Sequence, residues 1–599
     1  MDRIDKMDDY LLIPEPREVK MLPGFYKLTE EIIRGVLNFR AGDSLPQGID
    51  ETADAAIGDP EAYILHIRPG GIKIKSKTET GTYYAICTLK QVFRQHSDHA
   101  IRCMTIRDWP DFPHRAIMLD VSRDRVPTME SLYKRIEMWG ELKYNQLQLY
   151  MEHTFAYHDH QKVWENASPF TAGEIRHIEG YCRKHAIELV PNQNSFGHME
   201  RWLVHPEYRK LAESPEGFTD PWGIFRKTPS TLSPAEPSTI SFLKSLYDEL
   251  LPNFESRFFN IGGDETYELG MGISKKLCEE IGKEKVYINF IDELRRLAAA
   301  RGKRIMVYAD MILQFPHIPG EISDDIILLE WGYESNHPFE RNTLRLKESG
   351  LEFYVCAGTS SWNSIGGRWG NAKGNIRKAA FYGRKNGAVG FLLTDWGDNG
   401  HWQQPIISIP ACFYAAQAAW NQEKIEMLNM EHVLDIHFFD DFTASASKAL
   451  LIMQDIYKND RFMLENFSIQ AALLLDPVFP YLRPAYKHFR GYKFEDELKQ
   501  IKKAGELLEK AEGKIEQELL HEMIFSLKLL KHACCLGSFL FSTKNLKITE
   551  IPKEKRKNLS EEIGELIGDY KILWLRDSRP GGLEDSSGRL EKLREIYDS

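Results

Sequence analysis

Short apolar runs alternate with amphipathic stretches through the middle of the chain. Runs that are apolar on both faces suit parallel strands covered on both sides. Apolar positions three and four residues apart predict helices, for example over 131–142, 171–185 and 286–301. The eight predicted strands are 116–121, 146–151, 188–192, 258–261, 304–308, 326–331, 352–356 and 390–394. Eight strands alternating with helices predict an α/β fold, a (β/α)8 TIM barrel.

The pattern changes on both sides of this region. Before it, 63–67 and 72–75 read as strands of a hairpin with Gly70-Gly71 at the turn, and a helix is expected over 81–95. After it, charged faces with apolar positions at three and four spacing predict helices over 431–458, 494–513, 514–542 and 559–575. We therefore expect a small α+β domain over 1–110, the barrel over 111–425 and an α-helical C-terminal domain over 426–599.

Composition narrows the class of protein. The chain has 599 residues, 42% of them hydrophobic, and a net charge of −11, which argues against a nucleic-acid partner. It contains no stretch of eighteen apolar residues, so no membrane span is expected. The first nine residues lack the apolar segment of a secretory signal, and the eight scattered cysteines show no metal-ligand spacing. We expect a cytoplasmic protein that uses no metal and no cofactor.

Polar and aromatic residues follow nearly every predicted strand. Because a barrel gathers these strand ends on one face, they predict a cleft dense in carboxylates and indoles. The residues are Asp120, Arg123, Glu152, His153, Asn192, Asn194, His198, Asp264, Glu265, Asp310, Trp331, Trp362, Asn363, Asp395, Trp396 and Asp398.

The adjacent carboxylates of Asp264 and Glu265 are the centre of this set. On a regular strand they would point to opposite faces. Gly262 and Gly263 permit a bend that could turn both toward one ligand. The alternative is a solvated strand-to-helix loop in which Asp264 caps a helix.

The segment Ile261-Gly262-Gly263-Asp264-Glu265 resembles the signature of the glycoside hydrolase family 20 β-N-acetylhexosaminidases. Residues 112–123 look like that family's first barrel strand, and Gly197-His198 matches a Gly-His after the third. Residues 13–16 and 82–91 resemble its small leading domain. The resemblance spans about residues 10 to 425, and the helical C-terminal part resembles a bacterial three-domain, intracellular-type subgroup.

The resemblance implies an exo-acting hydrolase that uses substrate assistance and acts on an N-acetylhexosamine-terminated glycan or glycoconjugate. The acetamido oxygen of the substrate would attack the anomeric carbon and form an oxazolinium-like intermediate. Glu265 would act as general acid and base, and Asp264 would orient the acetamide. The family pattern leaves the choice between GlcNAc and GalNAc open, and a homodimer is a further expectation.

The family pattern also implies sugar-binding positions. Arg115 would hold sugar hydroxyls, His198 would support the acidic pair, and Asp398 would bind the outer hydroxyls and enforce exo action. The remaining expected substrate-binding residues are Trp331, Trp396, Tyr308, Glu152 and Trp362. Tyr308 stands where many members have a tryptophan, and the family's acetamide-binding tyrosine has no obvious counterpart.

Two other functions remain open. A metal-dependent barrel hydrolase could use the same acidic cleft, although no HxH or HExxH motif appears. A catalytically inactive sugar-binding barrel is the other possibility, although both motif carboxylates are present.

Overall fold

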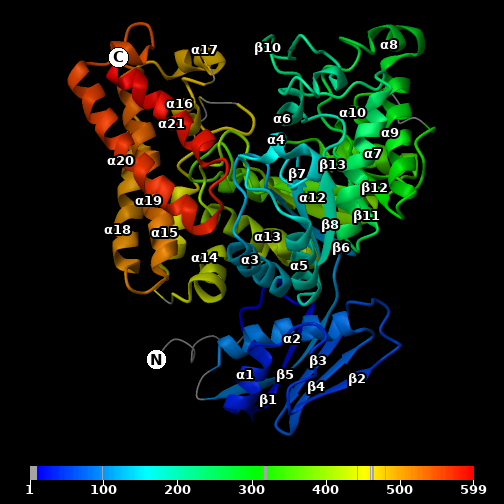
Figure 1. The fold of residues 1–599 in the computed structure, drawn as a ribbon. Helices are drawn as coiled ribbons and strands as arrows, with labels where there is room; N and C mark the ends of the chain where they lie inside the picture. The colour runs from blue at the N-terminus through cyan, green and yellow to red at the C-terminus, as the bar shows by residue number, and fades with distance from the viewer. Residues whose placement is uncertain are drawn as a thin grey trace.

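A computed structural model describes residues 10–96, 99–315, 320–441, 443–458, 461, 464–478 and 480–599. Three parts are visible in Figure 1: a small sheet with helices, a barrel, and a group of long helices beside the barrel. The segment that prompted the expectation about a secretory signal, residues 1–9, lies outside the described residues.

Eight parallel strands close into a barrel in the order β11-β12-β13-β14-β15-β6-β7-β8, which confirms the predicted fold class. Each predicted run is a strand. They are β6 (His114–Asp120), β7 (Gln146–Met151), β8 (Glu188–Gln193), β11 (Phe258–Asn260), β12 (Arg304–Tyr308), β13 (Ile327–Trp331), β14 (Phe353–Gly358) and β15 (Gly390–Asp395). Side chains such as Met118, Val190 and Leu392 fill the interior, so the barrel is a packed core.

Helices cover the outside of the barrel and bury their apolar faces on it. They are α3 (Met129–Glu141), α5 (Ala172–Arg183), α7 (Ser238–Leu250), α9 (Lys283–Ala299), α11 (Phe339–Ser349), α12 (Trp369–Asn386) and α13 (Ile409–Trp420). The short helix α8 (Lys275–Ile281) precedes α9 and has no buried residue. Thr128 caps α3 by accepting the Ser131 N–H, and Thr171 with Glu174 forms a capping box on α5. These caps explain why the two predicted helices begin where they do.

The N-terminal part is a five-stranded sheet in the order β1-β5-β3-β4-β2 with two helices. Its elements are β1 (Glu18–Lys27), α1 (Glu30–Leu37), β2 (Ile49–Ala53), β3 (Tyr63–Arg68), β4 (Gly71–Ser76), α2 (Glu79–Arg94) and β5 (Ala100–Asp108). The predicted hairpin and helix are confirmed. Trp420, from the end of α13, inserts into the core of this part and meets Tyr84 of α2 edge-on at 5.3 Å.

The C-terminal part is helical, as predicted. Its main helices are α14 (Met430–Leu434), α15 (Ser445–Met453), α16 (Ile469–Leu474), α18 (Glu495–Ala511), α19 (Gln517–Leu540), α20 (Lys553–Asp577) and α21 (Leu583–Asp598). The helix predicted over 431–458 is interrupted after α14, where Asp440 and Ala444 adopt left-handed backbone conformations with φ of 50° and 56°. The expected boundaries between the parts stay predictions.

One hydrophobic cluster joins the outer surface of the barrel to the C-terminal helices. It includes Val126 and Ala415 of the barrel together with Leu530, Trp574 and Leu590 of the helices. Helix α19 is long and apolar enough to cross a membrane by length and composition, but 67% of its apolar window is buried here. The packing therefore accounts for the apolar character of α19 as part of this shared core.

Candidate active site

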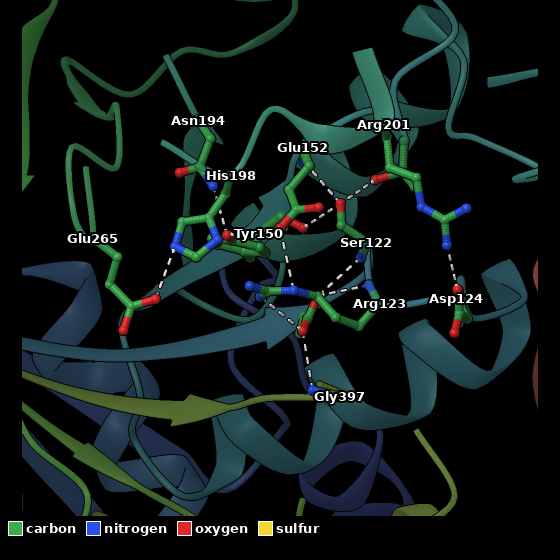
Figure 2. A network of polar contacts seen from close by, with 12 residues as sticks. Ser122, Arg123, Asp124, Tyr150, Glu152, Asn194, His198, Arg201, Glu265 and Gly397 are labelled. Atoms are coloured by element: carbon green, nitrogen blue, oxygen red, sulfur yellow. Dashed lines mark hydrogen bonds and ion pairs between the residues drawn. The ribbon is translucent and has the colours of Figure 1, made fainter. Parts of the chain in front are cut away.

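The backbone after β11 bends so that two neighbouring carboxylates meet. Gly262, Gly263 and Glu265 have φ of 72°, 90° and 49°, so the chain leaves the extended conformation. The Nε2 atom of His198 lies 3.1 Å from Oδ2 of Asp264 and 3.6 Å from Oε2 of Glu265. Figure 2 shows the imidazole between Glu265 and the groups around Glu152. The carboxylates of Asp264 and Glu265 therefore both approach the His198 ring, and the bend turns them toward one place.

Close packing fixes His198 against the acidic pair. A Cβ atom at the preceding Gly197 would lie 2.5 Å from the carbonyl oxygen of Asp264, so only glycine allows this approach. Burial alone would lower the pKa of His198, but the Asp264 carboxylate raises it to about 10. The imidazole is therefore a cation near neutral pH.

The two carboxylates differ in their surroundings. Glu265 has a side chain that is 32% exposed, whereas that of Asp264 is 9% exposed. Burial and the nearby Asp264 charge raise the pKa of Glu265, with His198 acting in the opposite direction. Oδ1 of Asp264 is buried and has no hydrogen-bond partner among the described residues. Glu265 is thus suited to carry a proton, and Asp264 has an oxygen free to accept one hydrogen bond.

Asp310, just after β12, binds both the backbone of Glu265 and the side chain of Trp331. Its Oδ2 accepts the backbone N–H of Glu265 at 3.1 Å, and its Oδ1 accepts the indole N–H of Trp331 at 3.2 Å. Burial and the Asp264 charge raise the pKa of Asp310. The position of Asp310 after a strand marked it for the cleft, but its support of Glu265 depends on backbone geometry that the sequence does not show.

The prediction for Arg115 is wrong. Arg115 lies at the start of β6, at the opposite end of the barrel from Glu265, and is 1% exposed. Its guanidinium donates to Glu61 at 2.6 Å, to the Tyr84 hydroxyl at 3.1 Å and to main-chain oxygens, and it covers the Trp420 ring. These contacts tie the barrel to the N-terminal part, so Arg115 is a structural residue.

Arg123 is the arginine that the structure brings to the site. It follows β6, and its guanidinium contacts Asp120 and Glu152 at 3.1 Å each. The guanidinium also lies over the rings of Tyr150 and Trp396, at 4.5 Å and 4.9 Å from their centroids. Figure 2 shows Arg123 joined to Glu152, with Tyr150 and His198 beside them. The position of Arg123 just after a predicted strand was a signal for the cleft. The sugar-binding role was assigned instead to Arg115, the other arginine of the same segment.

Glu152 lies inside this network. It is 6% exposed and accepts the Tyr150 hydroxyl hydrogen at 3.0 Å in addition to its contact with Arg123. Burial raises its pKa, and Arg123 counteracts that shift. Glu152 therefore positions Arg123 in the site.

Aromatic rings surround the space beside the acidic pair. Trp331 stacks on Tyr333 with centroids 5.2 Å apart, and Tyr333 meets Trp362 edge-on at 5.2 Å. Trp396 packs edge-on against Tyr150 at 4.6 Å. Tyr308, at the end of β12, is buried in the same inner cluster. The predicted aromatic residues thus meet in one place, joined by Tyr333 and Tyr150, which had not been selected.

Asp398 lies after β15 near the same space. Its Oδ2 accepts a hydrogen bond from the Asn363 amide at 3.2 Å. Burial raises the pKa of Asp398 to about 6, with Arg123 acting in the opposite direction. The charges of Arg123 and Asp398 therefore influence each other.

Known protein families match both the barrel and the part before it. The profile of the catalytic domain of glycosyl hydrolase family 20 matches residues 112–362, and that of the family's domain 2 matches residues 37–109. The catalytic match contains the Gly-Gly-Asp-Glu turn described above. The chain belongs to glycoside hydrolase family 20.

Curated relatives are distant in sequence and are matched over only part of their length. A lacto-N-biosidase of Bifidobacterium bifidum is 23% identical over 325 residues, which are 52% of this chain and 28% of the relative. A β-hexosaminidase of Emericella nidulans is 22% identical over 334 residues, 51% of this chain and 54% of the relative. The chain thus spans about a quarter to a half of these relatives.

Solved structures of family 20 members share the fold. A chitobiase of Flavobacterium johnsoniae has a TM-score of 0.58 at 16% identity, covering 96% of this chain and 100% of that one. An exo β-N-acetylglucosaminidase of Vibrio harveyi has a TM-score of 0.58 at 16% identity, covering 72% and 78%. The first alignment extends over nearly the whole chain and therefore includes the C-terminal helices.

Proposed function

We propose that this family 20 chain is an exo-acting β-N-acetylhexosaminidase that hydrolyses terminal β-linked GlcNAc or GalNAc with retention of configuration. The observation that supports this most directly is the convergence of Asp264 and Glu265 on His198. The substrate is an N-acetylhexosamine-terminated glycan or glycoconjugate.

The reaction needs no nucleophile from the protein. The acetamido carbonyl oxygen of the substrate bonds to the anomeric carbon while the glycosidic C–O bond breaks, and Glu265 gives its proton to the leaving oxygen. Water then attacks the anomeric carbon and passes a proton to Glu265. The bond between the anomeric carbon and the acetamido oxygen breaks in the same step, which restores the acetamide. The free Oδ1 of Asp264 accepts the acetamide N–H and offsets the positive charge that develops there.

The surrounding residues bind the terminal sugar. Arg123 and Asp398 offer a cation and a carboxylate to its outer hydroxyls, and Trp396 offers an aromatic face to its apolar C–H side. A terminal hydroxyl held by both charged groups leaves no route for a longer chain in that direction, which gives exo action.

Replacing Glu265 with glutamine tests the assignment. The amide introduced by Glu265→Gln cannot protonate the leaving group, so hydrolysis of chromogenic β-GlcNAc and β-GalNAc substrates should fall about 10²- to 10⁴-fold. The exposed Glu348 provides a matched control, since Glu348→Gln removes a surface carboxylate far from the site. Full activity of Glu265→Gln would refute the role of Glu265.

The same assay separates the alternatives. Activity that survives a chelator is expected here, whereas loss of activity with a chelator and recovery with metal would indicate a metal-dependent hydrolase. A wild-type chain that binds GlcNAc without hydrolysing either substrate would indicate an inactive sugar-binding barrel.

We also propose a cytoplasmic homodimer. All eight cysteines are free, which suits a reducing compartment. Ile572 and Leu575 are exposed on α20 and could pack against a second copy. Cell fractionation and light scattering test the two statements separately, and neither outcome affects the assigned chemistry.

A further inference from the structure

Large apolar side chains are exposed on the rim next to Glu265. Trp222 is 67% exposed, and Phe225, Met271 and Ile273 are exposed as well. Single exposed apolar residues are common on protein surfaces, but a group of them in one area marks a binding surface. The four residues come from two loops, one after β8 and one after β11.

The first loop is a built hairpin. The strands β9 (Phe218–Thr219) and β10 (Phe225–Arg226) pair, and Trp222 lies at the tip between them. Asp220 is buried and accepts the N–H groups of Trp222 at 3.0 Å and Ile224 at 2.8 Å, and the Arg226 Nε–H at 2.9 Å. Gly223 supplies the positive φ that the turn needs. The tip is therefore held in place although its indole faces solvent.

The second loop is fixed by another buried carboxylate. Glu213 is fully buried and accepts the N–H groups of Gly272 at 3.0 Å and Ser274 at 3.1 Å. Its main-chain oxygen also accepts the Ile273 N–H at 2.9 Å. Because Glu213 lies just before the hairpin, it joins the two loops into one surface.

Tyr267 links this surface to the catalytic residue. The rings of Trp222 and Tyr267 meet edge-on with centroids 5.8 Å apart. The Tyr267 N–H donates to the Glu265 carbonyl oxygen at 2.7 Å, and burial and the nearby Glu265 charge raise the pKa of the Tyr267 hydroxyl. His198 contacts the Glu265 carboxylate at 3.6 Å, and its ring lies between Glu265 and Arg123 in Figure 2. Tyr267 belongs to the loop after β11 that also carries Met271 and Ile273.

We propose that Trp222 and Tyr267 form a subsite for the leaving group, and that this leaving group is a sugar. The inference rests on the proposed function, which places the leaving oxygen at Glu265. Departing groups pass outward from Glu265, and Trp222 offers a flat apolar face there that matches the C–H side of a pyranose ring. The natural substrate is accordingly an oligosaccharide whose terminal N-acetylhexosamine is linked to a second sugar.

The test compares two substrates in the full-length protein. Di-N-acetylchitobiose has a sugar as leaving group, whereas methyl β-N-acetylglucosaminide releases methanol and has no ring to stack. Trp222→Ala should lower kcat/KM for the disaccharide roughly 3- to 10-fold and leave that for the methyl glycoside unchanged. Trp222→Tyr should restore most of the loss because it keeps an aromatic face.

Phe25→Ala is the matched control, since Phe25 is an aromatic residue of similar exposure on β1 and far from the site. It should alter neither substrate. An equal loss on both substrates, or no loss on either, would overturn the subsite. A wild-type chain inactive on both would refute the proposed function instead.

Discussion

Arg115 and Arg123 show how one strand separates two similar residues. Arg115 begins β6 and Arg123 follows its end. At about 3.3 Å per residue, the strand covers roughly 16 Å between Arg115 and its last residue, Asp120. Arg123 lies beyond that end, so the two arginines are at opposite ends of the barrel. The shared motif does not reveal which arginine faces the cleft, because both flank the same apolar run.

Substituting each arginine by methionine should separate their roles. Arg115→Met leaves Glu61 without its buried partner and should lower the free energy of unfolding by about 3 kcal/mol, with kcat/KM of the folded protein unchanged. Arg123→Met should lower kcat/KM for β-GlcNAc substrates by about tenfold or more, as loss of a charged hydrogen bond predicts. Urea unfolding and steady-state kinetics measure the two effects. An activity loss confined to Arg115→Met would restore the original assignment.

His198 controls the protonation of Glu265. The positive charge of the imidazole lowers the pKa of Glu265, so its removal in His198→Gln should raise that pKa. A general acid is active in its protonated form, and kcat/KM therefore falls as the pH rises through its pKa. The alkaline limb of the pH profile should move to higher pH in His198→Gln. A limb that stays in place or moves to lower pH would contradict this coupling.

At the scale of elements, the turn between α20 and α21 holds the loop that carries Arg123. The Arg579 N–H donates to the Val126 carbonyl at 2.8 Å, and Arg125 Nε donates to the Ser578 hydroxyl at 2.8 Å. Arg589 of α21 pairs with Asp124 at 2.7 Å. Figure 1 shows α21 running along the side of the barrel. The C-terminal helices thus hold Arg123 in place through its neighbours Asp124, Arg125 and Val126.

Gly582→Ala should test this support. Gly582 has a φ of 76°, and a Cβ atom there would lie 1.8 Å from the carbonyl oxygen of Asp124. The substitution should therefore displace the Arg123 loop and lower both thermal stability and kcat/KM. Gly588 lies within α21, which Gly582 precedes. A Cβ atom at Gly588 meets open space, so Gly588→Ala should raise stability by about 0.5–1 kcal/mol through helix propensity. Equal behaviour of the two variants would argue against the contact.

Elements were predictable where their own sequence specified them. The eight strands and the helices capped by Thr128 and Thr171 follow from local pattern and cap chemistry. The strands of the hairpin that carries Trp222 have two residues each, too few to show an alternation of apolar and polar positions. The turn at Ser578 pairs with Pro127, hundreds of positions away in the sequence. Contacts of that kind depend on how the parts pack, which periodicity does not report.

At the scale of the whole molecule, the barrel and the C-terminal helices share one apolar core. The N-terminal part has a second core, joined to the barrel at Trp420 and at the fully buried pair of Lys143 and Asp108, which are 2.8 Å apart. The helical part is therefore not an independent appendage, although its sequence texture suggested a domain of its own.

Truncation provides the corresponding test. A chain that stops after Leu428 would expose the barrel face that Leu530 and Trp574 now cover, so it should aggregate or bind a hydrophobic dye and lack a cooperative thermal transition. The full-length chain is the reference, measured by calorimetry under the same conditions. A truncated chain that unfolds cooperatively and keeps its activity would show that the helices are dispensable.

The bend at Gly262, Gly263 and Glu265 has a consequence for how this catalyst can change over time. The backbone torsions of this turn orient both carboxylates, so any change in the turn moves Asp264 together with Glu265. Gradual changes of the backbone therefore cannot adjust the orientation of one carboxylate while leaving the other in place. Only a substitution of the side chain at position 264 or at position 265 can alter one of the two groups alone.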